Sequence, residues 1–247
     1  VLREAAETIK PVSLELGGKS ANVVFADADL DAAANMAVIS SVVAMSGQTC
    51  ICPSRLLVER EIYDRFLATV VEKAESVQLG DPFAPATMMG PVISDAACRR
   101  ILGVIDDARA EASGQLLTGG SRAEGELSDG FFIPPTVFGD VDNDSALAQH
   151  EIFGPVLAAM PFDEEDHAVA LANATDYGLA GYVHTGDIKR AHRMAGRLDA
   201  GYLSINGWAV MPPGAPFGGN RRSGIGRLGG RAALQEFVRT KNVYVGL

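Results

Sequence analysis

The chain has 247 residues, a formal net charge of −10 and a hydrophobic fraction of 47%. This length and composition are typical of one large or two small globular domains, and they exclude disorder, collagen-like repeats and a disulfide-stapled miniprotein. The acidic excess argues against a nucleic-acid partner, which needs a basic face. No apolar run approaches the roughly 20 residues that span a bilayer, so we expect no membrane partner.

The first residues have helical periodicity, because Leu2, Ala5, Ala6 and Ile9 recur at helical spacing with no initiator Met before them. The simplest interpretation is that residue 1 falls inside a helix and that the chain is a fragment of a longer protein. Next, Val12, Leu14 and Leu16 alternate with polar residues, which predicts a strand that ends at Gly17-Gly18.

The rest of the chain alternates between strand-like and helix-like segments. The predicted strands are 11–16, 21–25, 55–58, 115–118, 131–138, 156–162, 180–184, 201–205 and a last one around 242–245. The predicted helices are 30–44, 61–77, 94–112, 164–172 and 188–198. This alternation is typical of an α/β fold with a largely parallel open sheet flanked by helices.

The three cysteines are an odd number, which fits a reducing compartment and a cytoplasmic location better than a disulfide framework. Cys50 and Cys52 have one residue between them and no nearby histidine, so the spacing does not indicate a metal site. Cys52 stands beside Pro53 and Cys98 lies on an amphipathic helix, and we expect both to be structural.

Cys50 follows a helix stop at Ser46-Gly47, in an irregular segment that could present its thiol to a substrate. The alternative is a small buried hydrophobic residue, which is how most free cysteines behave. Glu15 lies on the polar face of its strand, as an ordinary surface carboxylate does. If the glycine turn after it packs near Cys50, Glu15 becomes a candidate general base.

Two later segments also allow more than one interpretation. Glu151 and Phe153 precede a predicted strand, where they form either a capped loop or a site that binds vicinal hydroxyls and a flat heterocycle. Residues 217–227 are rich in glycine, but no predicted strand leads directly into them and the spacing is wrong for a dinucleotide fingerprint. A packed connection with close backbone approach explains these glycines equally well.

Several motifs occur together in one order along the chain, and in this order the sequence resembles the C-terminal, catalytic half of the NAD(P)-dependent aldehyde dehydrogenase superfamily. They are Leu14-Glu15-Leu16-Gly17-Gly18-Lys19-Ser20, Gly47-Gln48-Thr49-Cys50, Glu151-Ile152-Phe153-Gly154-Pro155, Pro216-Phe217-Gly218-Gly219 and Ser223-Gly224-Ile225-Gly226-Arg227. The resemblance covers essentially all of the chain.

The resemblance implies a role for each motif. Cys50 would add to an aldehyde carbonyl, its backbone N–H would donate to the oxyanion, and Glu15 would activate the water that hydrolyses the thioester. Glu151 would hold the ribose hydroxyls of NAD or NADP, and Phe153 would lie beside the nicotinamide. The residues that align with the substrate tunnel are bulky and apolar, which favours a hydrophobic aldehyde: Trp208, Met211 and Phe217.

The resemblance also implies a domain plan. Residues 1–17 would be the end of an N-terminal cofactor-binding domain, and residues 18–217 would form the catalytic domain. Residues 218–238 would return toward the cofactor domain, and residues 239–247 would form an oligomerisation strand of a homo-dimer or homo-tetramer. Since most of the cofactor domain is missing, the chain alone should be inactive.

The chain departs from the family pattern at two places. Asn220-Arg221 replaces a more usual aromatic-Lys pair, and Leu228 stands where Glu is common. We expect neither departure to touch the chemistry.

Two other functions compete with aldehyde oxidation. A cysteine-dependent ester or thioester hydrolase would need Cys50 and Glu15 but would have no use for the ribose-binding carboxylate of Glu151. A non-catalytic scaffold on the same fold would need none of the three. The presence of all three side chains therefore favours the dehydrogenase.

Overall fold

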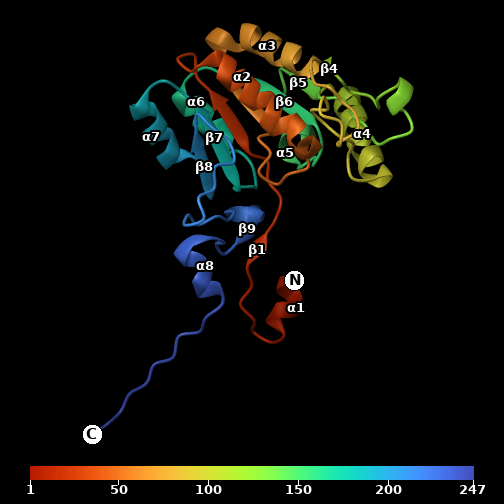
Figure 1. The fold of residues 1–247 in the computed structure, drawn as a ribbon. Coiled ribbons are helices and arrows are strands. Elements are labelled where there is room, and N and C mark those ends of the chain that lie inside the picture. The colour runs from red at the N-terminus through yellow and green to blue at the C-terminus, as the bar shows by residue number, and fades with distance from the viewer.

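The computed structural model describes all residues 1–247 and contains one seven-stranded sheet with helices on both faces (Figure 1). The strand order is β4-β5-β6-β3-β2-β7-β8, and every neighbouring pair is parallel except β4 with β5. The bounds are β2 Ala21–Val24, β3 Arg55–Glu59, β4 Gln115–Thr118, β5 Thr136–Gly139, β6 Val156–Phe162, β7 Ala180–His184 and β8 Tyr202–Ile205. The expected α/β fold with a largely parallel open sheet is confirmed.

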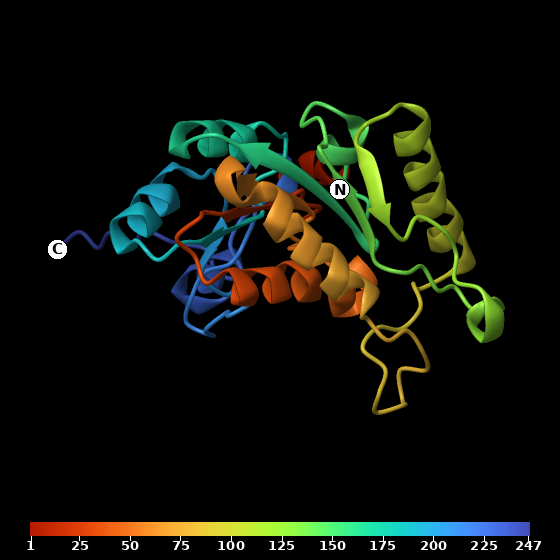
Figure 2. The same ribbon diagram turned by 90° about the horizontal axis from the view of Figure 1, so that it is seen from above.

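Helices cover the two faces of this sheet because successive strand side chains point to opposite sides. On one face α2 (Leu30–Val38) and α3 (Tyr63–Glu75) bury a core with alternate strand residues such as Val24 and Leu56. On the other face the covering helices are α4 (Asp95–Ala110), α5 (Ala146–Gln149), α6 (Glu165–Asn173) and α7 (Ile188–Arg197). Figure 2 shows α2 and α3 running side by side across the sheet.

A second, two-stranded sheet lies below the amino ends of the large sheet in Figure 1. It pairs β1 (Leu14–Glu15) with β9 (Gly224–Ile225) in antiparallel register, so that Glu15 stands opposite Gly224. Two short helices, α1 (Leu2–Ala6) and α8 (Gly230–Glu236), lie beyond it. This small sheet brings the start of the chain against residues more than 200 positions later.

Several predicted elements differ from the observed ones. The strand predicted over 11–16 keeps only Leu14–Glu15, because β9 offers only two residues for pairing. The strand expected around Val243 and Val245 does not form; both residues are exposed and no strand lies beside them. The helix α8 was not expected. The domain boundaries proposed from the family resemblance stay predictions.

The segment Leu30–Gly47 comprises α2 and the two short helical turns that follow it, Ile39–Val43 and Ala44–Gly47. Its 18 residues have a mean hydropathy of 1.3, so by length and composition alone it could cross a membrane, contrary to the expectation from the sequence. Half of the segment is buried inside the protein, with Ala33 and Ala37 in the core under α2. Because a buried core helix meets the same criteria, the segment is weak support for a membrane role.

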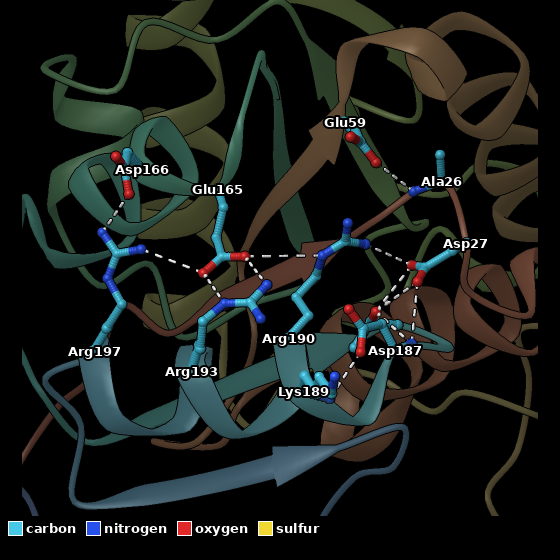
Figure 3. Close-up of polar contacts among 11 residues, drawn as sticks. Ala26, Asp27, Glu59, Glu165, Asp166, Asp187, Lys189, Arg190, Arg193 and Arg197 are labelled. Atoms are coloured by element: carbon cyan, nitrogen blue, oxygen red, sulfur yellow. Dashed lines mark hydrogen bonds and ion pairs between the residues drawn. The ribbon is translucent and has the colours of Figure 1, made fainter.

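An ion-pair network occupies the carboxyl ends of the central strands (Figure 3). Glu165, at the start of α6, accepts hydrogen bonds from Arg193 at 3.0 and 2.7 Å and from Arg197 at 3.3 Å. Asp27, just after β2, accepts a hydrogen bond from Arg190 at 2.9 Å, and the Arg190 guanidinium also stacks over the Phe25 ring. The network ties α6 and α7 to β2, at the sheet edge opposite the candidate active site.

Candidate active site

Cys50 lies at the opposite, amino edge of the sheet, in the segment that leads into β3. The turn before it has left-handed backbone at Met45, Ser46 and Gly47, with φ of 50°, 55° and 70°. At Gly47 a Cβ atom would lie 2.2 Å from the carbonyl oxygen of Gly154, so the close packing of this turn requires glycine. The Cys50 side chain is half-buried rather than sealed in the core.

Gly17 and Gly18 allow three distant segments to meet. A Cβ at Gly18 would lie 2.4 Å from the carbonyl oxygen of Cys50, and a Cβ at Gly17 would lie 2.3 Å from Glu151 Oε2. The backbone N–H of Gly18 donates a hydrogen bond of 3.0 Å to Glu151 Oε1. A side chain at Gly18 would meet backbone, which cannot yield, whereas one at Gly17 would meet the flexible end of Glu151. Gly18 is therefore the position where the close approach of the Cys50 backbone requires glycine.

Glu15 belongs to the same site. Both of its carboxylate oxygens are buried and neither accepts a hydrogen bond. Burial raises the pKa of Glu15, and the nearby Arg227 guanidinium opposes this rise. A carboxylate with a raised pKa and free oxygens is suited to exchange a proton with water or a thiol.

The pKa of the Cys50 thiol depends on burial and on the carboxylates of Glu151 and Glu15. Burial is the largest factor that raises its pKa, and the charges of Glu151 and Glu15 raise it further. The backbone N–H groups of Cys50 and Ile51 act in the opposite direction. The structure thus brings Cys50, Glu15 and Glu151 within electrostatic range of one another, and it leaves the thiol protonated until a base or a cation favours the thiolate.

The alkylation rate of Cys50 tests this proximity. Glu15→Gln removes one negative charge, so the pKa of Cys50 should fall and its reaction with iodoacetamide at neutral pH should accelerate by about two- to tenfold. The rate is measured by mass spectrometry across pH. Cys52 and Cys98 are only 7% and 1% exposed, so they should react far more slowly.

Glu75→Gln is the matched control, because Glu75 is an exposed residue on α3 and the charge change is the same. It should leave the alkylation rate unchanged. Equal rates in wild type and Glu15→Gln would show that the two side chains do not face each other.

An apolar cluster flanks Cys50. Its buried members are Ile51, Leu179, Ala180 and Tyr182, and Trp208 and Phe217 pack against them. Met211, the third residue expected in the substrate tunnel, is 41% exposed and lies outside this cluster. Trp208 and Phe217 therefore border Cys50, whereas Met211 stands apart from them. The assignment of all three residues to a substrate tunnel stays a prediction.

Glu151 and Phe153 border the same edge of the sheet. Phe153 is 42% exposed and has left-handed backbone, with φ of 52°. Arg100 on α4 holds this turn, because its guanidinium donates to the carbonyl oxygens of Ile152 at 2.5 Å and Phe153 at 3.4 Å. An accessible ring and a carboxylate beside a bare glycine backbone fit the ribose and nicotinamide of a dinucleotide.

Two charged residues near the site had no role assigned from the sequence. Lys19 is 1% exposed and its Nζ has no hydrogen-bond partner; burial lowers its pKa to about 7. Arg227 approaches Glu15 from the β9 side. Both belong to motifs of the family resemblance, but nothing in the local pattern indicates that they face the other candidate residues.

Residues 1–243 match the aldehyde dehydrogenase family. Betaine aldehyde dehydrogenases from Cereibacter sphaeroides and Sinorhizobium fredii are 44% and 42% identical over this whole chain and 50% of their own length. An aldehyde dehydrogenase from Bacillus cereus, solved as an NAD+ complex, superposes with a TM-score of 0.95 at 40% identity, over 100% of this chain and 49% of that one. A betaine aldehyde dehydrogenase from Staphylococcus aureus in complex with NAD+ gives 0.93 at 38% identity, over 96% and 47%.

The strand order defines an α/β fold, and the chain spans about half the length of the curated relatives it matches. The chain belongs to the aldehyde dehydrogenase family. The resemblance stated from the sequence motifs is confirmed.

Proposed function

We propose that the protein containing this chain oxidises an aldehyde to a carboxylic acid with NAD+ as the hydride acceptor. The observation that carries this proposal is the convergence of Cys50, Glu15 and Glu151 around Gly17-Gly18 in a member of the aldehyde dehydrogenase family. NAD+ is favoured over NADP+ because the solved relatives from Bacillus cereus and Staphylococcus aureus are NAD+ complexes. Glu151 would hold the ribose hydroxyls, and Phe153 would lie beside the nicotinamide.

The Cys50 side chain would carry the first half of the reaction. Its thiol loses its proton to solvent, and the thiolate sulfur attacks the aldehyde carbon to form a thiohemiacetal. The backbone N–H of Cys50 donates to the developing oxyanion. Departure of the aldehyde hydrogen as hydride, which is the chemistry NAD+ supplies when bound, leaves a thioester on the sulfur.

Glu15 would carry the second half. Its carboxylate takes a proton from a water molecule, and the water oxygen attacks the thioester carbon. The carbon–sulfur bond breaks, the carboxylic acid leaves, and the sulfur recovers a proton. The unpaired oxygens of Glu15 support this role, because no hydrogen bond has to be broken before water is engaged.

The substrate side of the site is aromatic. The Tyr182 and Tyr202 rings are 6.1 Å apart, the Tyr202 and Phe217 rings are 6.2 Å apart, and Trp208 packs nearby. Such a lining favours a hydrophobic aldehyde, because burial of apolar surface drives binding. Aromatic faces also bind quaternary ammonium groups, so betaine aldehyde, the substrate class in the names of several relatives, is the comparison substrate.

An aldehyde panel tests the proposal. The protein that contains this chain should form NADH with NAD+ and a hydrophobic aldehyde. The 247-residue chain alone should form essentially none, since it spans only about half the length of the relatives it matches. Hydrolysis of an activated ester without NAD+, and with no NADH formed from any aldehyde, would instead identify a cysteine hydrolase. Inactivity in both assays would favour the remaining hypothesis, a non-catalytic scaffold on the same fold.

We also propose a cytoplasmic homo-dimer or homo-tetramer, on the family resemblance alone.

A further inference from the structure

The loop after the substrate-side residues carries a hydrogen-bond chain that ends at Arg227, beside Gly218 and Glu15. Asn220 stands where an aromatic residue is more usual in the resemblance, and its side chain bonds in two directions. Its Oδ1 accepts a hydrogen bond of 2.6 Å from Arg227 Nη2, and its Nδ2 donates one of 2.9 Å to Asp199 Oδ1. Asp199 lies in the connection from α7 to β8, so Asn220 links the Arg227 guanidinium to the edge of the main sheet.

Arg227 is fixed at a definite place by these bonds. Its Nη1 donates to the carbonyl oxygens of Gly219 at 3.0 Å and Gly226 at 2.8 Å, while Nη2 is held by Asn220. A Cβ on Gly218 would lie 3.0 Å from Arg227 Cδ and also 3.0 Å from Glu15 Oε1. Arg227 and Glu15 therefore flank the same bare side of Gly218.

The charged groups around Glu15 are few. Arg227 lowers the pKa of Glu15 against the effect of burial, and the charge of Glu15 in turn raises the pKa of Cys50. Glu236 of α8 lies behind Arg227, where its Oε1 accepts a hydrogen bond of 3.4 Å from the Arg227 backbone N–H. Arg227 is the cation that opposes the effect of burial on the pKa of Glu15.

We propose that Asn220 is a positioning residue for aldehyde oxidation: it holds Arg227 across Gly218 from Glu15 and so keeps this carboxylate ready to accept a proton from water. The proposal rests on the proposed function, because it concerns the step that hydrolyses the thioester. It also reverses the expectation that the departure at Asn220-Arg221 is remote from the chemistry.

The test is the pH dependence of thioester hydrolysis in the full-length protein. Asn220→Leu keeps the side-chain size but removes both hydrogen bonds. The Nη2 side of the Arg227 guanidinium then loses its partner while Nη1 keeps its two carbonyl oxygens, and the pKa of Glu15 should rise. The acid limb of the hydrolysis rate should move to higher pH, and below its midpoint hydrolysis should slow by about threefold or more. Arg227→Met should move the limb in the same direction, and Asn220→Leu should add nothing in the Arg227→Met background.

Arg221→Leu is the control for a purely structural effect. Arg221 donates a hydrogen bond of 2.6 Å to the other oxygen of Asp199 and braces the same loop, but it makes no hydrogen bond with Arg227. This variant should leave the acid limb in place. The proposal would be overturned if the acid limb of the hydrolysis rate did not move in Asn220→Leu, or if it moved equally far in Arg221→Leu. These comparisons of hydrolysis require that the wild-type protein forms NADH rapidly in its first turnover. If it forms no NADH, the proposed function itself is refuted.

Discussion

Replacement of Cys50 by alanine is expected to reduce NADH formation by the full-length protein by about 10⁴-fold or more. The reason is that no other thiol reaches the site: Cys52 is buried and its Sγ donates to the carbonyl oxygen of Ser41 at 3.1 Å, and Cys98 is buried in the core under α4. Without a sulfur nucleophile no thiohemiacetal forms, so the hydride cannot leave. Steady-state rates with a saturating aldehyde measure the effect.

Cys52→Ala is the matched control, because it removes a thiol two residues away that we expect to be structural. It should keep activity within about tenfold of wild type, with any loss accompanied by lower thermal stability. Turnover by a folded Cys50→Ala variant at more than a few per cent of wild type would contradict the assignment of the nucleophile.

Replacement of Glu15 by glutamine is expected to separate the two halves of the reaction. The amide cannot take a proton from water, so hydrolysis of the thioester should slow by about 10²- to 10⁴-fold. Thioester formation should continue, because Cys50 and the apolar cluster are unchanged and the thiol pKa falls when the negative charge is removed. Rapid mixing should therefore show one fast turnover of NADH followed by a very slow steady state.

Glu7→Gln is the control for a general effect of losing a carboxylate, since Glu7 is an exposed residue near the end of α1. This variant should form NADH at the wild-type rate both in the first turnover and in the steady state. A Glu15→Gln variant that also loses the fast phase would indicate that Glu15 acts before the thioester, as the base that removes the proton from Cys50.

Periodicity predicted most of the sheet and its helices because each element has a strong local pattern. The strands β2, β6 and β7 lie within the predicted ranges and β3 extends one residue beyond its range, since their apolar runs are buried on both faces by helices. The strand predictions that failed wholly or in part are those that depend on a pairing strand far away in the sequence. β1 is short because its register is set by β9, and residues 242–245 form no strand because none lies beside them.

The candidate site could be predicted only through the motifs that resemble a known family. Positions 15, 50 and 151 are far apart in the chain, and each has an ordinary local interpretation. Their convergence depends on Gly17 and Gly18, whose missing side chains admit Glu151 and the Cys50 backbone. The exposure of Met211 and the role proposed for Asn220 arise from the folded path of residues 207–228, which no periodicity describes.

The most direct test of the site is the mass of the full-length Glu15→Gln variant, quenched in acid after one turnover with aldehyde and NAD+. We expect the variant to gain the mass of one acyl group, to carry it on the peptide that contains Cys50, and to keep it long after the wild type has lost it. An unmodified Cys50 peptide after NADH has formed, or an acyl group that leaves as fast as in wild type, would show that this sulfur and this carboxylate do not act on the same carbon.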